Sequence, residues 1–297
     1  MNLVIGASGR LGSAIAERLL QNGMQVKAVS RQPGKLEALK SMGAEVIRGD
    51  LRDPSWMDGA MQNVRYLFLT AHGLVPPSRS NSIDRVDDAG HRSIIDAAKR
   101  SSVERIFFIS AYIARPDSPI KFGRIKHKIE EYIKVSDLEY TIVRPGAFIE
   151  THVIFLMAEP LRQFGKVKIF GKGKTPVTWI SVGDVADFLV RCIEDTGARN
   201  TIKLIGGPDI RSRIQVLEII ERLLGKKAKR SHLPTGILRV MKVLSKPLNP
   251  SLSYLLEATL AEEYPSRPED WKPGNLDWIA PTSVEGVVKR WIEKNRN

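Results

Sequence analysis

The chain has 297 residues, of which 42% are hydrophobic, and carries a formal net charge of +13. This length can bury a substantial core, but the longest apolar run, residues 153–158, is far shorter than the roughly 18 residues of a membrane span. The single cysteine, Cys192, excludes an internal disulfide and a cysteine-cluster metal site. We expect a cytoplasmic protein with no metal, no transmembrane segment and, because a strand pattern begins at Asn2, no cleavable leader.

The first two-thirds of the chain alternates between short apolar runs and amphipathic helical patterns. The apolar runs are residues 3–6, 24–30, 44–50, 64–70, 104–110 and 139–145. The helical patterns are residues 9–23, 33–43, 54–62, 82–102 and 125–137. Near-continuous apolar strands that alternate with helices are typical of a parallel sheet covered on both faces. We therefore predict an α/β fold with a doubly wound, Rossmann-type parallel sheet.

After Pro145 the pattern becomes irregular. Residues 165–176 predict a β-hairpin with Gly171 and Gly173 in its turn. Residues 178–195 predict a strand followed by a helix that begins near Gly183 or Asp184. The remaining predictions are a strand at 201–206, a helix at 214–225 and a strand at 226–234.

This pattern predicts two domains. Residues 1–150 form the nucleotide-binding domain, to which residues 178–206 return, and residues 151–297 form a smaller α+β cap around the substrate. The tail is expected to pack as part of this cap or to wrap the main domain. Its large aromatic residues are Tyr264, Trp271, Trp278 and Trp291.

The stretch GASGRLG places three glycines, three residues apart, at the end of the first predicted strand. Gly6 permits a tight turn, Gly9 lets the backbone approach a pyrophosphate, and Gly12 allows a helix to pack closely on the strand. The following helix directs unpaired N–H groups and its positive dipole end toward the phosphates. We therefore predict dinucleotide binding rather than a purely structural turn. The residues of this predicted site are Gly6, Ala7, Ser8, Gly9, Arg10, Leu11 and Gly12.

The end of the second predicted strand indicates which dinucleotide is bound. An NAD site usually has an acidic residue there, but this chain has Ser30 and Arg31, and no acid before Glu37. A guanidinium suits a 2′-phosphate, and the missing carboxylate removes a repulsion. We therefore predict NADP(H), with Ser30 and Arg31 at the ribose; the alternative is that Arg31 only points into solvent.

Further motifs follow the other predicted strands. They are GDLRDP (49–54), LTAHG (69–73), ISAY (109–112), SDLEYTIVRPGAFIE (136–150) and TWISVGDVAD (178–187). Together with residues 206–229, they resemble the NmrA-like branch of the atypical short-chain dehydrogenase/reductases over most of the chain. The resemblance implies contacts with adenine (Asp50, Leu51), with the ribose and diphosphate (Thr70, Ala71, His72) and with nicotinamide (Pro145, Gly146, Phe148). The alternative is that these are ordinary turn residues at strand ends, with Asp50 capping the next helical turn.

Reductases of the wider superfamily use a serine, a tyrosine and a lysine, the last two being four residues apart on one helix. The resemblance places Ser110 at the serine and Lys126 at the lysine, but it places Phe122 at the tyrosine. This is the main departure from the pattern, because a phenyl ring cannot exchange a proton.

Three hypotheses follow for the catalytic residues. Lys126 alone serves as acid and base or holds the nicotinamide ribose, so that it also belongs to the cofactor site. Alternatively, Tyr112 or a histidine (His72 or His127) supplies the proton. In the third hypothesis no chemistry occurs, and the protein is an NADPH-dependent sensor or assembly factor. For Lys126 itself, the alternative is an exposed helix lysine.

We predict an NADP(H)-dependent oxidoreductase that transfers hydride to or from a small organic substrate, with Phe148 and His152 shaping the substrate site. The alternative is an NADPH-binding redox sensor or assembly protein of the NmrA-like type without turnover. We expect a monomer or a homodimer.

Much of the positive charge lies between residues 211 and 246, a segment that contains ten Lys/Arg but only two Glu. The basic residues alternate with apolar ones rather than with aromatics, so we favour a solvated basic face and expect no specific nucleic acid. A weak contact with an anionic surface through residues 211–246 is the alternative, since residues 236–246 fit a basic amphipathic helix.

Overall fold

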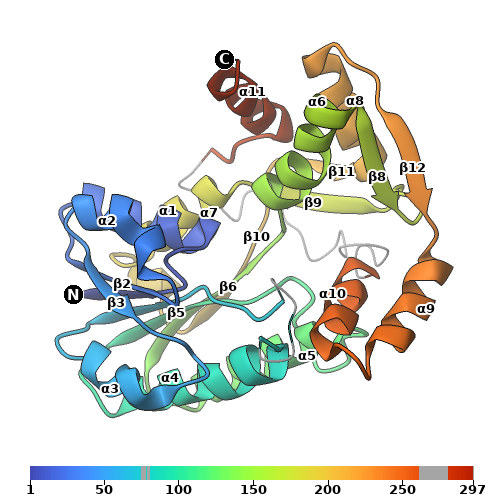
Figure 1. Cartoon of the computed structure of the whole chain (residues 1–297). Helices are drawn as coiled ribbons and strands as arrows, with labels where there is room; N and C mark the ends of the chain where they lie inside the picture. Colours follow the sequence, from blue (N-terminus) through green and yellow to red (C-terminus); the bar gives the residue numbers. More distant parts are fainter. Residues whose placement is uncertain (75–77, 79–80, 261–279, 297) are drawn as a thin grey trace.

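Seven parallel strands form the central sheet of the computed structural model, in the order β10-β6-β5-β4-β1-β2-β3 (Figure 1). The structure describes residues 1–74, 78, 81–260 and 280–296. The strands of this sheet are β1 (Asn2–Ile5), β2 (Val26–Ser30), β3 (Glu45–Arg48), β4 (Tyr66–Leu69), β5 (Arg105–Ile109), β6 (Glu139–Pro145) and β10 (Thr201–Ile205). From β1 the chain builds outward on both sides, which confirms the predicted doubly wound fold.

Helices cover both faces of this sheet (Figure 1). One face carries α1 (Arg10–Gln21), α2 (Glu37–Ser41) and α7 (Val182–Arg191), and the other carries α3 (Met57–Ala60), α4 (His91–Lys99) and α5 (Lys121–Lys134). Short helical segments precede or follow them: η1 (Pro33–Leu36), η2 (Pro54–Trp56), η3 (Asp84–Gly90) and η5 (Thr196–Ala198). Successive strand residues enter opposite cores, because side chains alternate across a strand; Val4 lies in one core and Leu3 in the other.

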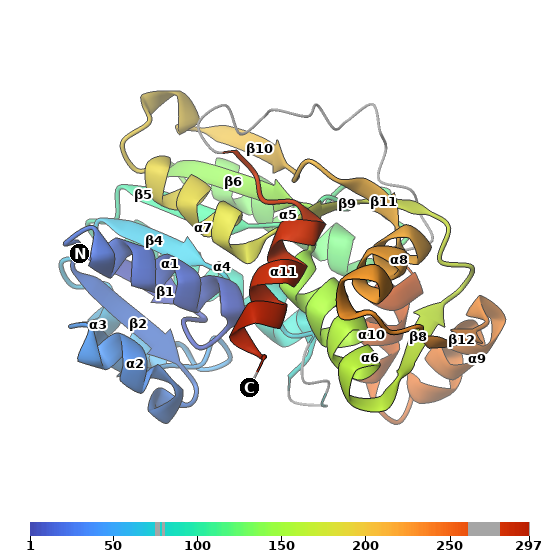
Figure 2. The same cartoon turned by 90° about the horizontal axis from the view of Figure 1, so that it is seen from above.

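A third core lies beside the sheet, on the side where residues after Pro145 gather (Figure 2). It is built by η4 (Glu150–Ala158), α6 (Glu159–Phe164), α8 (Arg213–Leu224) and α11 (Val284–Lys294) around the fully buried Trp179. Two small sheets complete it: β11 (Ile210–Ser212), β9 (Pro176–Ile180) and β7 (Ala147–Phe148) in one, β12 (Lys229–Leu233) and β8 (Lys166–Phe170) in the other. Then α9 (Thr235–Ser245) packs on α10 (Pro250–Leu260), which packs on α5.

The predicted hairpin at residues 165–176 is wrong. The chain does turn there, since Gly171 and Gly173 both have a left-handed φ of +63°. However, β8 pairs in parallel with β12, while β9 pairs with β7 and β11. The prediction fails because the partner of β8 lies some sixty residues further along the chain, where local pattern carries no information on pairing.

The tail returns to the third core through α11, where Trp291 packs half-buried against the other helices. Thr282, just before α11, donates through its backbone N–H (2.7 Å) and its hydroxyl (2.9 Å) to the carboxylate of Asp184 near the start of α7. Tyr264, Trp271 and Trp278 lie outside the described residues.

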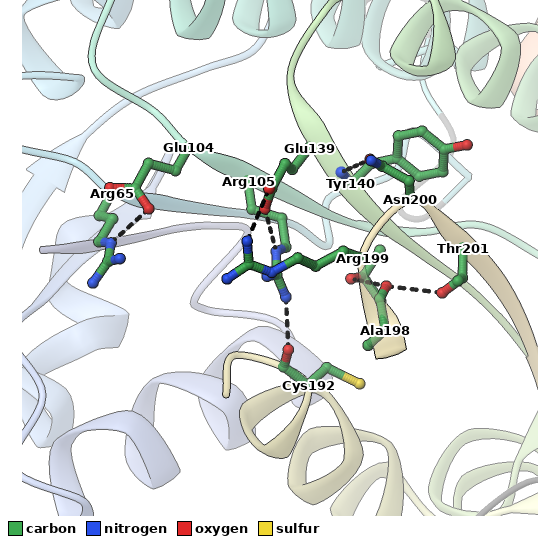
Figure 3. Close-up of polar contacts among 11 residues, drawn as sticks. Arg65, Glu104, Arg105, Glu139, Tyr140, Cys192, Ala198, Arg199, Asn200 and Thr201 are labelled. Carbon is green, nitrogen blue, oxygen red and sulfur yellow. Dashed lines mark hydrogen bonds and ion pairs between the residues drawn. The ribbon is translucent and has the colours of Figure 1, made fainter. Parts of the chain in front are cut away.

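At the amino ends of β5 and β6, an ion-pair network joins β10 and α7 to the sheet (Figure 3). Arg105, whose side chain is 1% exposed, donates to the carbonyl of Cys192 (2.7 Å) and pairs with Glu139 (3.3 Å). Glu139 also accepts a hydrogen bond from Arg199 at 3.0 Å. The network therefore stabilises the sheet at the amino ends of its strands, away from the glycine loop at the carboxyl ends. In the described part of the chain, no helix is both long and apolar enough to span a bilayer.

Candidate functional site

The loop between β1 and α1 is built so closely that glycine is required. Gly6 has φ +86°, and a Cβ there would lie 2.8 Å from the hydroxyl oxygen of Thr70. A Cβ on Gly12 would lie 2.3 Å from the carbonyl oxygen of Gly6. Gly9 is the N-cap of α1, and no side chain caps this helix end. The first N–H groups of α1 are thus left to bind an anion.

A cavity of about 230 Å³ opens at this loop, over the carboxyl ends of β1, β2 and β4. The predicted cofactor residues that line it are Gly6, Ser8, Gly9, Ser30, Arg31, Asp50, Leu51, Thr70, Ala71 and His72. Sequence reasoning missed the other lining residues, which are Ile5, Val29, Gly49, Asn81 and Val86. Four of these are apolar residues or a glycine. They have no polar side chain, so the sequence alone does not distinguish them from residues of the hydrophobic core.

Polar contacts fix the wall of the cavity at the end of β2. The hydroxyl of Ser30 donates to that of Ser8 (2.9 Å), which ties this strand to the glycine loop. Arg31 donates to the side-chain oxygen of Asn81 at 2.9 Å, so its guanidinium is held at the cavity rather than pointing only into solvent.

Asp50 is paired by a neighbour that the sequence reasoning missed. Both oxygens of its carboxylate accept hydrogen bonds from the guanidinium of Arg52, and this bond lowers the pKa of Asp50. Its carboxylate also accepts the backbone N–H of Arg52 at 3.0 Å. The next helical segment, η2, is capped by Asp53, whose side chain accepts the N–H of Ser55, so the alternative that Asp50 caps this segment is wrong. The negative charge of Asp50 at the cavity wall is therefore matched by the neighbouring cation of Arg52.

The other predicted cofactor residues do not line this cavity. Ala7 is fully buried, and Leu11 packs in the core below the loop. Arg10 lies over the ring of Phe155 at 6.0 Å, which connects the start of α1 to η4. The three residues predicted at nicotinamide lie where β6 continues into β7: Pro145, Gly146 and Phe148.

Lys126 is a buried lysine, not an exposed helix lysine. Its side chain is 3% exposed and its ammonium donates to the carbonyl of Ile109 (3.2 Å) and lies 3.3 Å from the carboxylate of Asp87. The ammonium also lies over the rings of Phe108 (4.8 Å) and Phe122 (5.2 Å). Burial lowers the pKa of Lys126, and the charge of Asp87 opposes this shift.

Asp87 is the main charged residue that the sequence reasoning missed. Its side chain is fully buried, and its second oxygen accepts the backbone N–H of Gly73 at 2.7 Å. It therefore links Lys126 to the loop after β4, which carries His72. In the sequence, Asp87 is one of several charged residues in a predicted helix, and nothing there marks it as buried. In the structure this segment is the π-helix η3, and the side chain of Asp87 is buried.

Ser110 is engaged by a second buried carboxylate. Its hydroxyl donates to Glu130, which is fully buried and also accepts two hydrogen bonds from Arg144. The predicted tyrosine position is occupied by Phe122, whose ring meets that of His72 edge-on at 6.5 Å. His127 lies 3.8 Å from Glu130, and Tyr112 lies half-buried in the turn after β5.

His91 adds a neutral group beside this cluster. The carbonyl of Asp87 lies 3.1 Å from Nδ1, so Nδ1 carries the proton, because a carbonyl can only accept. Its Nε2 is buried and has no hydrogen-bond partner among the described residues. Burial lowers the pKa of His91 to about 4. The imidazole therefore stays neutral near pH 7.

Two other features of the described residues do not line the glycine-loop cavity. A hollow of about 360 Å³ between α1 and α7 lies at the amino ends of the strands, beside the Arg18–Asp187 ion pair. His152 lies 3.3 Å from Arg213 in the third core. No group of three or more His, Cys, Asp or Glu in the described ranges is placed to hold a metal ion.

Comparison with known proteins assigns the glycine loop to a family. The sequence model described as NAD(P)H-binding matches residues 6–196. The photosystem II assembly factor Ycf39 of Guillardia theta is 30% identical over 82% of this chain and 76% of its own length. The NAD(P)H azoreductase of Xenophilus azovorans is 28% identical over 77% of this chain and 76% of its own length.

Solved structures share the fold over nearly the whole chain. An NADPH-dependent quinone oxidoreductase from Escherichia coli, complexed with NADPH, has a TM-score of 0.77 at 22% identity and covers 98% of this chain and 100% of its own. A Citrobacter triphenylmethane reductase complexed with NADP(H) has a TM-score of 0.75 at 18% identity, with coverages of 97% and 99%. At these identities the likeness concerns the fold alone.

Proposed function

Because the chain belongs to the NAD(P)H-binding family of NmrA-like, atypical short-chain dehydrogenase/reductases with a Rossmann fold, we propose that it is an NADP(H)-dependent oxidoreductase of the cytoplasm acting on small organic substrates. The observation that carries this proposal is the glycine loop, whose uncapped helix end opens into a cavity walled by Arg31. We assign residues 1–150 and 178–206 to the cofactor domain and the rest of 151–297 to the substrate cap.

The residues at this cavity fit the cofactor. The free N–H groups at the start of α1 would bind the diphosphate, since Gly6, Gly9 and Gly12 bring the backbone close without side chains. Arg31 would bind the 2′-phosphate, while Arg52 neutralises the carboxylate of Asp50 that would otherwise repel it. When bound, NADPH would supply the hydride.

The surroundings of Lys126 limit which acceptors can be reduced. Burial lowers the pKa of Lys126 and so eases proton loss, but the carboxylate of Asp87 and the two ring faces stabilise the charged ammonium. We therefore assign Lys126 to holding the ribose hydroxyls. Phe122 provides no acid in the place of the tyrosine. Acceptors whose reduced anion is stable enough to take its proton from water are therefore favoured over simple ketones. Quinones meet this condition, and a fold neighbour is a quinone oxidoreductase.

The cofactor assignment is tested by the binding of NADPH and NADH to Arg31→Ala. A charge-assisted hydrogen bond contributes about 2 kcal/mol, so the variant should bind NADPH about 30-fold more weakly and NADH almost unchanged. Lys35→Ala, which removes a nearby exposed cation on η1, is the matched control and should keep the preference. Equal affinities of the unchanged protein for both dinucleotides would refute the NADP(H) assignment.

Turnover is tested by NADPH oxidation with quinones, enals and imines. Lys126→Met should lower kcat/KM about 100-fold, the usual effect of losing a positioned catalytic group. Because this variant leaves Asp87 buried without its cation, Lys126→Met/Asp87→Asn serves as a second variant in which no charge is stranded. Unchanged turnover in a folded double variant would remove Lys126 from the mechanism.

A second candidate function is an NADPH-dependent assembly or sensor protein without turnover. The absence of a phenol at Phe122 and the engagement of Ser110 by Glu130 favour it, and an assembly factor is among the relatives. Tight NADPH binding, no oxidation with any acceptor, and partner capture that requires NADPH would support this function over the first.

A further inference from the structure

Helix α9 presents an apolar stripe to solvent. The stripe consists of Ile237, Val240, Met241 and Leu244, which are 47%, 58%, 44% and 67% exposed. Their i, i+3, i+4, i+7 spacing is that of a helix face which normally packs against a core. The stripe faces away from the protein, because α9 packs on α10 through the opposite side, where Leu238 is 2% exposed.

The inner side of α9 is also fixed by charge. Lys242 pairs with Glu257 of α10 at 2.7 Å, so the orientation of the helix on its support is defined. Rotating α9 to bury the stripe would break this ion pair and expose Leu238. The exposed stripe is therefore a feature of the folded surface that calls for an external partner.

The surface next to this stripe is strongly basic. Residues 225–250 contain seven Lys/Arg and no Asp or Glu, although Lys227 and Arg230 pair with Glu221 and Lys242 pairs with Glu257. Residues 165–176 contain four lysines and no acid. These two segments meet in the small parallel sheet, where Lys229 lies beside Lys166, and both side chains are exposed. The chain then continues from β12 directly into α9, at the same end of the molecule (Figures 1 and 2).

We propose that α9 docks the protein on an anionic lipid surface, with its apolar stripe at the acyl boundary and the neighbouring lysines and arginines at the phosphate groups. An exposed apolar helix face next to concentrated positive charge is the pattern of helices that lie in a membrane interface. Helix α9 thus gives a structural basis to the weak contact with an anionic surface that the sequence offered as an alternative for residues 211–246.

Other occupants fit the charge or the stripe less well. Nucleic acid would use the lysines but leave the four apolar side chains in water. A second copy packed through the same face would bring two basic surfaces together, which costs electrostatic energy. An anionic lipid surface satisfies both features, because it offers phosphates above a hydrocarbon layer.

The test is co-sedimentation of the full chain with vesicles of phosphatidylcholine alone or with added phosphatidylglycerol. It requires neither NADPH nor substrate, so its outcome is independent of the proposed function. We expect binding to the anionic vesicles, loss of that binding in high salt, and about a tenfold or greater loss for Val240→Gln/Leu244→Gln. Arg239→Gln/Lys246→Gln should lose about 30-fold on anionic vesicles.

Matched variants remove the same chemistry elsewhere. Val135→Gln/Met42→Gln replaces exposed apolar residues after α5 and α2, and Lys40→Gln/Lys99→Gln removes two exposed cations. Both should bind vesicles like the unchanged protein.

Three outcomes would overturn the proposal. The first is no binding to anionic vesicles. The second is binding that survives loss of the stripe, which indicates charge alone. The third is a protein that does not bind vesicles but forms a dimer in sedimentation velocity, when that dimer is lost in Val240→Gln/Leu244→Gln.

Discussion

Acid should destabilise this protein through His91 before most carboxylates are protonated. The imidazole is fully buried, and its pKa is about 4 in the folded protein against an ordinary value of 6.5. Between these pH values the unfolded chain binds the extra proton, so stability is fully present above pH 6.5 and is lost as the pH falls toward 4. For these two pKa values the expected loss from pH 7.5 to pH 5 is about 2 kcal/mol.

Urea unfolding of the protein and of His91→Phe, followed by circular dichroism at both pH values, measures this loss. The phenyl ring can keep the edge contact with Phe108 but cannot titrate. The variant should therefore lose about 2 kcal/mol less than the unchanged protein between pH 7.5 and pH 5. His232→Phe, the same substitution at an exposed histidine, is the matched control. The reasoning fails if His91→Phe shows the same loss as the unchanged protein.

Two further predictions concern the strand ends and the tyrosine position. Arg105→Ala removes a buried cation but leaves Glu139 its second partner, so it should cost about 3 kcal/mol and lower Tm by about 8 °C. Arg65→Ala, at a pair that is more than half exposed, should cost under about 1 kcal/mol, and thermal melts that show equal losses would contradict the network's role. Phe122→Tyr supplies a phenol that can donate a proton, so it should raise the rate of ketone reduction at least about tenfold and leave the rate of quinone reduction the same. Stopped-flow measurement of NADPH oxidation tests this. A rate that rises equally for both classes of acceptor would argue against an acid at this position.

The sequence was sufficient to predict the central sheet and the loop that builds its site. Buried strands such as the predicted one at residues 3–6 have continuous apolar sequences, and the spacing of Gly6 and Gly12 reflects a steric requirement that a Cβ would violate. Both patterns can be recognised within one short stretch of sequence, although the atoms that a Cβ on Gly6 would meet belong to Thr70 and Ala71. Arg31 was predicted for the same reason, since the end of β2 lies at a fixed distance from the glycine loop along the chain.

The rest depended on contacts that the sequence pattern does not encode. β8 found its partner in β12, and Asn81 reached Arg31 from fifty residues away. Asp87 lies within the helical pattern at residues 82–102, which carried no separate signal for a buried carboxylate. The structure has a π-helix at Asp87, so the face on which this residue lies is not the one that a period of 3.6 residues predicts. In the structure its side chain points toward Lys126. Buried charge pairs of this kind are set by tertiary packing, so they are invisible to periodicity.

The glycine-loop cavity and the face of α9 are joined by a short series of contacts. Lys242 of α9 pairs with Glu257 of α10, and Ser251 of α10 donates to the carbonyl of Asn81 at 3.1 Å. The side chain of Asn81 in turn holds Arg31 at the cavity wall. Docking through α9 would therefore keep the cavity at a fixed position above the membrane. Apolar quinones partition into lipid, so docking would raise the concentration of such acceptors near the cavity without any change to the groups that bind the cofactor.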